Sequence, residues 1–287
     1  MEVIIYGVLR SVQYLLIALG FSFVYGVSRL PNFAHGALYV LTSFGTWTFL
    51  RTLGWNYLLS IFLSIIIVTA IGGAIYRFFL IRVRGMVMSE IIASYALGLA
   101  ILEGLRIRFV GASFATPRFM EGVPEIAGVP IDCQRLIIIG TGLTVVLIMW
   151  AFTHYTKVGL SLRAIAQNER AAMMLGIDSD MAAVIALALG STLVSLAAIV
   201  LAPIGSLTIE QGYDVLIYAI AVCIIGGLGS WTGTILASFI LGFAGMLTAT
   251  YIGGMWQSVV IVIAIILTLI IRPSGLFGRQ KEFEERV

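Results

Sequence analysis

Long, nearly continuous apolar stretches recur along the whole chain, with short polar segments between them. A helix needs roughly 20 apolar residues to cross about 30 Å of hydrocarbon, whereas a membrane β-barrel would show segments of about ten residues that alternate apolar and polar. The pattern therefore predicts an all-α, polytopic transmembrane helical bundle that forms one domain over residues 1–287. The predicted stretches are 4–27, 33–50, 56–80, 88–109, 135–153, 181–204, 213–229, 232–251 and 255–271.

Composition agrees with a membrane protein. Of the 287 residues, 60% are hydrophobic and 11% are charged, whereas soluble domains have about 45–50% and about 25%. The basic residues behind the net charge of +3 lie in short segments without interleaved aromatics, so membrane lipid is the expected surrounding and no nucleic acid is indicated. Cys133 and Cys223 lack the spacing of a disulfide framework or a metal site. The first stretch lacks a cleavage signal and is expected to stay as a permanent helix.

Three groups of basic residues fall on one side of the membrane if every predicted stretch crosses it. Cytoplasmic segments carry an excess of Lys and Arg, so this side is predicted to be the cytoplasm. The proline-containing segment 110–134 would then face outward, although four arginines in or near it oppose the assignment. The three groups are Arg77, Arg82 and Arg84; Lys157, Arg163 and Arg170; and Arg272, Arg279, Lys281 and Arg286, and the opposing arginines are Arg106, Arg108, Arg118 and Arg135.

The first two stretches leave the number of crossings open between eight and nine. Arg10 would lie inside the first helix, where an arginine costs roughly 2.5 to 3.5 kcal/mol on insertion scales. Either its side chain reaches an interface and the true span is 11–27, or the second stretch is re-entrant and the N-terminus is cytoplasmic. Both alternatives are consistent with the sequence.

Small residues repeat at helical spacing in the last third of the chain. Ser191 and Ser195 lie four residues apart, as do Thr234, Ser238 and Gly242 along their own helix. Such faces allow close helix packing, and packing within one subunit is the simpler explanation, with a subunit interface or pathway lining as the alternative. No sequence repeat is strong enough to predict an internal duplication.

The predicted spans contain few groups that could carry chemistry. They hold no paired carboxylates and no hydrolase motif. The glycine cluster 226–230 lacks the Gly-Lys-Ser or Gly-Lys-Thr of a phosphate loop, so we expect no ATP binding by this chain and a tight turn at the cluster. Glu103 is the acid embedded deepest in a span, and an ion pair with Arg106 is its simplest explanation. Proton coupling therefore lacks support, which favours an external energy source.

A polar, alanine-rich insert at 159–177, within a loop of about 154–180, interrupts the apolar pattern. Its small residues recur at three- and four-residue steps, which predicts one amphipathic helix. Gly159 before it and Gly176 at its end suit helix boundaries, and Ala164 and Ala172 would let another protein approach closely. A helix lying on the membrane fits less well, because the apolar side lacks large anchoring side chains.

Three motifs carry a resemblance to a known family. The insert, with Gly159, Arg163, Ala164, Asn168, Ala172 and Gly176 at fixed spacing, resembles the cytoplasmic coupling loop of ABC importer permeases for branched-chain amino acids. The segment 32–39, Asn-Phe-Ala-His-Gly-Ala-Leu-Tyr, is similar to the family's Asn-x-Ala-x-Gly signature, and 272–278, Arg-Pro-Ser-Gly-Leu-Phe-Gly, is similar to its C-terminal ending. Their order and spacing suit a LivH-type subunit over nearly the whole chain.

The resemblance implies a permease subunit in a prokaryotic inner membrane that forms half of a translocation pathway. It implies a second homologous permease, two cytoplasmic ATP-binding subunits that hold ATP and Mg, and an extracytoplasmic substrate-binding protein, with no cofactor on this chain. Branched-chain or related hydrophobic amino acids are the expected cargo; a related importer for urea or short amides, or a self-contained carrier or channel, is the alternative. The residues implied in ATPase coupling are Gly159, Arg163, Ala164, Asn168, Glu169, Ala172 and Gly176.

Asn32, His35 and Gly36 form a second candidate site at the start of the second stretch. Polar side chains beside a glycine at a helix start can line a pathway within the membrane. In the alternative, Asn32 caps the helix and His35 satisfies a neighbouring carbonyl group. The sequence does not separate these two roles.

Overall fold

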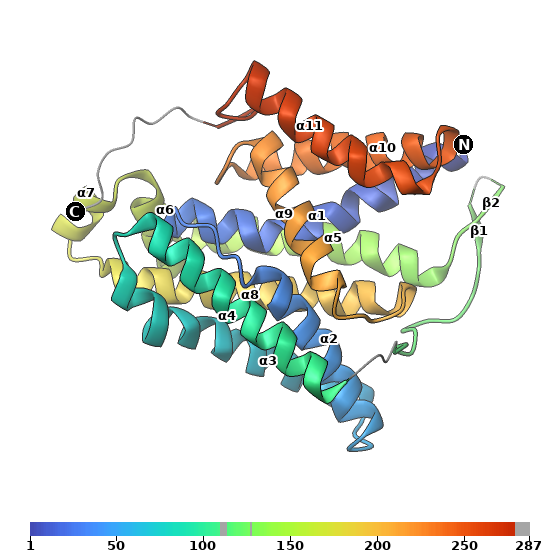
Figure 1. Ribbon diagram of the computed structural model, residues 1–287, viewed down its shortest axis with the longest axis horizontal. Helices are drawn as coiled ribbons and strands as arrows, with labels where there is room; N and C mark the ends of the chain where they lie inside the picture. Colours follow the sequence, from blue (N-terminus) through green and yellow to red (C-terminus); the bar gives the residue numbers. More distant parts are fainter. Residues whose placement is uncertain (110–113, 127, 279–287) are drawn as a thin grey trace.

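The computed structural model describes residues 1–109, 114–126 and 128–278 and is a single helical bundle (Figure 1). The basic residues 279, 281 and 286 of the predicted cytoplasmic tail lie outside the described residues. The bundle helices are α1 (Glu2–Ser28), α2 (His35–Arg51), α3 (Tyr57–Ala74), α4 (Val87–Arg108), α5 (Cys133–Tyr155), α8 (Ser179–Leu201), α9 (Gln211–Gly226), α10 (Trp231–Tyr251) and α11 (Gln257–Ile271).

Shorter elements connect these helices. A π-helical turn and a 3-10 turn continue α3 toward α4, and a small antiparallel hairpin precedes α5. The two turns are Ile75–Phe79 and Leu80–Val83, the hairpin is β1 (Glu125–Ile126) with β2 (Val129–Pro130), two further 3-10 turns are Ala202–Ile204 and Gly254–Trp256, and the polar insert forms α6 (Lys157–Gln167) and α7 (Glu169–Met174).

Every apolar stretch predicted from the sequence is a helix, so the all-α bundle is confirmed. In the described chain, seven helices are long and apolar enough to cross a membrane. The other two, α2 with 17 residues and α9 with 16, are shorter than a full crossing requires. The N-terminus lies at the end of the bundle opposite to α6 and α7 (Figure 1). A hydrogen bond to Gln257 and a cation–π contact with the ring of Tyr14 lower the cost of placing the charged Arg10 side chain within α1.

The four helices before α5 and the four after α7 form two units of similar architecture and opposite direction. Helix α10 packs against α1 as α3 packs against α8, while α2 and α9 contact each other. One small-residue contact even occurs twice, because Gly72 of α3 lies against Ser191 of α8 and Gly242 of α10 lies against Ser11 of α1. The paired contacts indicate an internal duplication, which the sequence did not predict, and its halves are inverted because α1 runs toward the α6–α7 end of the bundle whereas α8 runs away from it (Figure 1).

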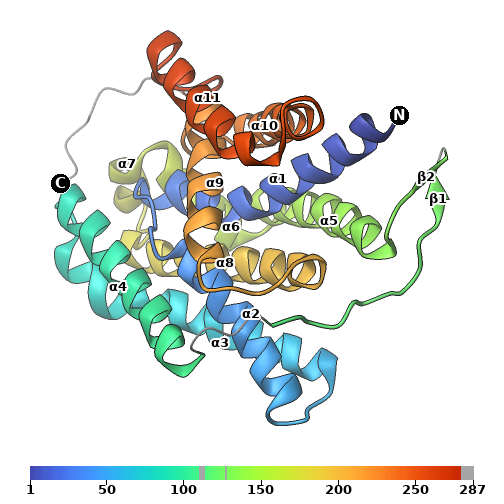
Figure 2. The same ribbon diagram turned by 45° about the vertical axis from the view of Figure 1, so that its right-hand side comes forward.

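Helices α2 and α9 both begin inside the bundle and are inclined to the other helices (Figures 1 and 2). Their first turns touch through Gly36 and Gly212: a Cβ added to Gly212 would lie 3.2 Å from the Gly36 carbonyl oxygen. The non-helical segments that precede them are buried at Ala34, which is 0% exposed, and at Leu207, which is 2% exposed. Leu207 also exchanges backbone hydrogen bonds of 2.7 and 3.2 Å with Phe114.

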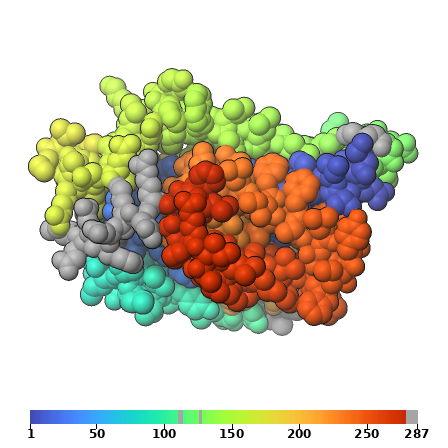
Figure 3. Space-filling model, turned by 90° about the horizontal axis from the view of Figure 1, so that it is seen from above, coloured from blue at the N-terminus to red at the C-terminus, as the bar shows by residue number. Residues whose placement is uncertain are grey.

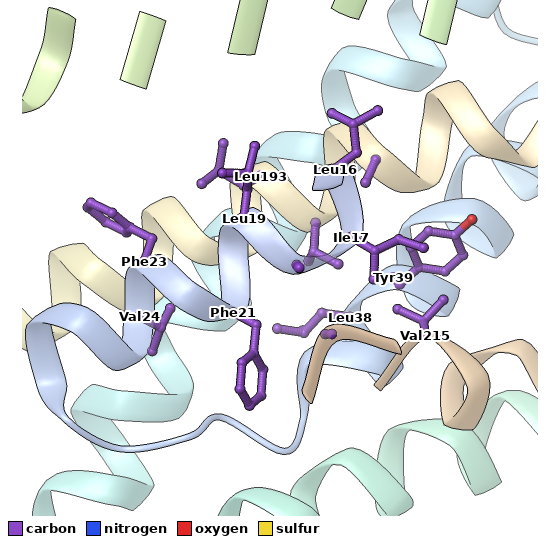
Figure 4. Packing of buried hydrophobic residues seen from close by; sticks show 14 of the residues in the cluster. Leu16, Ile17, Leu19, Phe21, Phe23, Val24, Leu38, Tyr39, Leu193 and Val215 are labelled. Carbon is purple, nitrogen blue, oxygen red and sulfur yellow. The ribbon is translucent and has the colours of Figure 1, made fainter. Parts of the chain in front are cut away.

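Helices α1 and α8 form the centre of the apolar core. Leu16, Ile17 and Leu19 of α1 lie beside Leu38 of α2 and Leu193 of α8 in the close view of Figure 4. By contrast, α10 and α11 cover an outer face in Figure 3, and only 6% of the α11 span is buried. The peripheral helices therefore present apolar side chains outward, as contact with lipid requires.

Hydroxyl groups join the central helices across this core. Ser22 bonds Thr234 at 2.7 Å, and Thr42 bonds Ser195 at 2.9 Å. Ser238 is also fully buried. The small-residue faces therefore pack within the subunit, as the simpler sequence explanation held.

The glycine cluster forms the predicted tight turn between α9 and α10. Gly227 and Gly229 have φ angles of 96° and 78°, which suit glycine. The C-terminal motif lies on this turn, because Leu276 and Phe277 donate backbone hydrogen bonds of 2.8 and 3.0 Å to the last carbonyl groups of α9. Two sequence motifs thus form one structural unit.

We expect Gly36→Ala to destabilise the protein because the new methyl group would meet the carbonyl oxygen of Gly212. Overpacking of this kind costs about 1–3 kcal/mol. Gly104→Ala in α4 is the matched control, since its Cβ would meet nothing within 4 Å. Thermal unfolding in detergent measures both variants. Equal melting temperatures would show that the α2–α9 contact is not closely packed.

Candidate functional site

The polar insert is two helices at an angle rather than the one continuous helix predicted. Asn168 has the extended dihedral angles φ −153° and ψ 103°, which end α6 and start α7. Its Oδ1 accepts a hydrogen bond of 3.1 Å from the Ala171 amide. Asparagine is among the preferred N-cap residues, so Asn168 makes the corner of the insert instead of contributing to a helix face.

The two glycines of the insert have different roles. Gly159 lies inside α6, whose first turn is capped by Thr156 through a hydrogen bond of 2.9 Å from the Gly159 amide. A Cβ on Gly159 would lie 2.7 Å from the Cα of Thr153, so this glycine allows α6 to fold back onto α5. Gly176 has a φ of 83° directly after α7, which agrees with its predicted place at the helix end.

One side of the insert packs into the bundle. Leu162, Ile165 and Ala172 are at most 3% exposed and belong to the main core, while Arg163 and Ala164 are partly exposed. The expectation that Ala172 offers a surface to another protein is therefore wrong for the isolated subunit. Its methyl group contacts the subunit's own core because α7 turns back at Asn168.

Other residues of the insert, which lies at one end of the molecule (Figure 3), expose large apolar side chains. Met174, the last residue of α7, is 83% exposed, and Leu175, which follows it, is 81% exposed. Met173, Val158 and Leu160 are also exposed. Exposed apolar groups outside the membrane-spanning helices indicate a protein interaction surface. Sequence reasoning missed Met173 and Met174, although the Met-Met-Leu run was the available signal.

Glu169 anchors the start of α7. Its Oε1 lies 2.5 Å from Nη2 of Arg84, which comes from the turn between α3 and α4. Partial burial favours the neutral form of Arg84, but Tyr76, Asp180 and Glu169 raise the pKa of its guanidinium above the ordinary value. Arg84 therefore stays charged. Sequence reasoning missed its contact with Glu169, because it used Arg84 only as one of the basic residues that predict the cytoplasmic side.

The second candidate site lies within the subunit core. Asn32 Oδ1 accepts a hydrogen bond of 3.1 Å from the Ala34 amide, and His35 Nε2 lies 2.9 Å from the Ile17 carbonyl oxygen. His35 is 1% exposed, and Gly36 lies against α9. His35 thus satisfies a neighbouring carbonyl group, as the alternative held, whereas Asn32 does not cap α2: the N-cap residue is Ala34, and Asn32 forms a turn that precedes the helix. Pathway lining by these three residues stays a prediction.

The acid in the fourth predicted stretch forms the expected ion pair. Glu103 lies 3.4 Å from Arg106, and Arg106 lies 3.7 Å from Glu210 at the start of α9. The side chains of Glu103 and Arg106 are nearly half exposed. The pair is therefore at the surface of the subunit, away from the α6–α7 corner.

Comparison with known proteins agrees with the sequence motifs. The family described as branched-chain amino acid transport system, permease component, matches residues 3–269. The chain is 27% identical to the high-affinity branched-chain amino acid transport system permease protein LivH of Escherichia coli K12, over 95% of this chain and 94% of that protein. It is 26% identical to BraD of Pseudomonas aeruginosa, which is described in the same terms, over 97% and 96%.

A solved structure shares the fold. The chain resembles one in PsaBC from Streptococcus pneumoniae in complex with Fab, with a TM-score of 0.51 over 96% of this chain and 94% of that chain. The two sequences are 11% identical. This likeness concerns the arrangement of the helices.

We expect Ala172→Leu to destabilise the isolated subunit, because the larger side chain must enter a filled core. The cost of such overpacking is about 1–3 kcal/mol. Ala171→Leu is the control, since Ala171 precedes it in the same helix and is exposed. The melting temperatures of the purified variants test this. A destabilised Ala171→Leu beside an unchanged Ala172→Leu would show that the opposite face of α7 is the packed one.

Proposed function

Since this chain belongs to the family of branched-chain amino acid transport permease components, we propose that it is the membrane subunit of an ATP-driven importer for branched-chain or related hydrophobic amino acids. Its relatives LivH and BraD are named for branched-chain amino acid transport. The single observation that carries the coupling mechanism is the α6–α7 corner with its exposed Met174 and Leu175. Cargo identity rests on the relatives.

The proposed assembly contains two permeases, two cytoplasmic ATP-binding subunits and an extracytoplasmic substrate-binding protein. ATP and Mg bind to the ATPase subunits, while this chain supplies half of the pathway. The phosphate-loop lysine is missing from the glycine cluster 226–230, which supports an energy source on another chain. The second permease is a homologue or another copy of this chain.

The α6–α7 corner lies at the cytoplasmic end in this proposal. Arg84, Lys157, Arg170 and Arg272 support it, because the turn after α3, the α6–α7 corner and the end of α11, which carry them, lie toward the same end of the bundle (Figure 1) and basic residues are enriched on the cytoplasmic side. The N-terminus and the β1–β2 hairpin, at the opposite end (Figure 1), then face outward. A substrate-binding protein meets the subunit at that outer end.

The coupling mechanism follows from the shape of the corner. Met174 and Leu175 enter an apolar groove on an ATPase subunit and lose contact with water. Closure of the ATPase pair on ATP moves the corner, and the bundle changes between outward and inward access. A ligand shifts such an equilibrium only through different contacts in the two states, so the docked corner must contact the ATPase differently in each.

We expect Met174→Asp combined with Leu175→Asp to abolish ATPase docking, because two charges cannot enter an apolar groove without a large desolvation cost. Membrane insertion and the melting temperature of the subunit stay unchanged, since both side chains are exposed. Copurification of the ATPase subunits and leucine uptake by reconstituted vesicles are the measurements.

Met120→Asp combined with Val123→Asp is the matched control, because both side chains are 60% exposed in the segment between α4 and α5, outside the candidate membrane spans. It should keep both ATPase binding and uptake. Full uptake by the double variant at Met174 and Leu175 would contradict docking at the corner. Leucine uptake by vesicles that hold this subunit alone would contradict an ATP-driven importer altogether.

A further inference from the structure

We propose that Arg84 is a positioning residue that links the α6–α7 corner to both inverted halves of the bundle and transmits the movement of the corner to them. The contacts of Arg84 with Glu169, Ser179 and Asp180 are called the clasp. The inference rests on the proposed docking of an ATPase at that corner. It adds a specific mechanical connection, formed by one guanidinium group and three partners. None of the sequence motifs includes Arg84.

The clasp joins three segments that are far apart in the sequence. Arg84 Nη2 donates to Glu169 Oε1 and to Ser179 Oγ, each at 2.5 Å, and Nη1 donates to Asp180. Ser179 also donates to Glu169. Glu169 is the first residue of α7, and Ser179 and Asp180 are the first two residues of α8. The guanidinium group therefore contacts the starts of both helices.

The position of Arg84 connects both structural halves. It lies between the turns that end α3 and the start of α4, which belong to the first half, whereas α8 opens the second half. Helix α8 packs against α1, α2 and α3 through the centre of the bundle. A displacement of α7 that pulls on Glu169 is therefore carried to the α3–α4 turn and to α8 at once.

Polar contacts hold this joint beside a small pocket. Arg84, Glu169 and Ser179 line the pocket together with residues from the end of α1 and the segment after it, from the turn after α3, and from α6 and α8. The lining includes Val27, Ser28, Leu30, Tyr76, Ile165 and Ala183.

The exposure of the clasp separates a mechanical role from a purely stabilising one. The side chains of Arg84, Glu169 and Asp180 are 29%, 25% and 40% exposed. Water partly screens ion pairs of this exposure, so each contributes modestly to folding stability. A forked guanidinium nevertheless fixes direction, because its planar donors hold two carboxylates and a hydroxyl group at set positions. Loss of Arg84 should therefore leave the fold intact and loosen the connection.

The test uses the complete importer, reconstituted in vesicles with its ATPase and binding-protein partners. Leucine uptake and ATP hydrolysis are measured together for Arg84→Gln, Arg84→Lys and the control Arg82→Gln. Arg82 is exposed in the same turn and makes none of the clasp contacts. Arg84→Gln should lower the uptake per ATP hydrolysed by about 5-fold or more, the range of an allosteric coupling. Arg84→Lys keeps the charge but loses the forked guanidinium group, so its uptake per ATP should lie between that of Arg84→Gln and that of the unsubstituted protein.

A covalent replacement of the clasp provides the rescue. Arg84→Cys with Glu169→Cys, in a background of Cys133→Ser and Cys223→Ala, is uncoupled as made and is then treated with a short bifunctional thiol reagent. Cross-linking of the two thiols should restore uptake per ATP. The same reagent applied to Arg82→Cys with Glu169→Cys should not alter the ratio from its untreated value.

Three outcomes overturn the clasp. The first is an uptake per ATP in Arg84→Gln that equals that of Arg82→Gln. The second is a fall in the yield and melting temperature of Arg84→Gln in parallel with uptake, with both restored in Arg84→Lys. The third is an uptake per ATP that cross-linking leaves unchanged. Failure of the proposed function is distinguishable, because the double aspartate variant at Met174 and Leu175 would then still bind ATPase. If Arg84→Gln still binds the ATPase subunits and keeps full uptake per ATP, the clasp is refuted while the proposed function stands.

Discussion

Backbone amide and carbonyl groups inside the hydrocarbon must find partners within the protein, and this constraint shapes the whole bundle. The two short helices α2 and α9 begin inside the bundle and follow non-helical segments that lipid could not solvate. Those segments are tolerated because they are buried by α1, α4 and α8 and because Leu207 pairs with Phe114. Close contact of the two helix starts requires glycine at 36 and 212.

Outside the hydrocarbon the constraint is reversed, and the α6–α7 corner shows the consequence. Water satisfies its backbone ends, so its helices are short and capped by Thr156 and Asn168. Its apolar groups divide into a set that packs into the bundle and a set around Met174 that stays exposed. An element that is anchored on one side and apolar on the other is suited to transfer force between a membrane bundle and a soluble partner.

Hydropathy predicted the helices well because burial in lipid or in the core is a local property of each stretch. It could not predict what depends on distant partners. The Arg84 clasp joins residues 85 and 96 positions apart, and the inverted duplication rests on a few small-residue contacts such as Gly72 with Ser191. The three- and four-residue steps of the insert placed Asn168 on a helix face, yet its side chain competes for the backbone and caps α7.

The burial of Ala172 was missed for a related reason. A small apolar residue has the same appearance in the sequence whether it faces its own bundle or a partner, and the bend at Asn168 decides which. The other two family motifs have different surroundings: the C-terminal segment packs on the glycine turn, and the Asn32 segment lies in the core. The sequence therefore indicated the candidate segments, while the direction of each side chain came from the structure.

Cross-linking in intact cells tests the central claim most directly. Leu175→Cys is introduced in the background of Cys133→Ser and Cys223→Ala, and a short bifunctional thiol reagent that crosses membranes is added to cells that produce the whole importer. The account predicts a cross-link between this subunit and an ATPase subunit, and no labelling of Leu175→Cys by an impermeant thiol reagent applied from outside. Labelling from outside, or a cross-link to the substrate-binding protein in place of the ATPase, would contradict it.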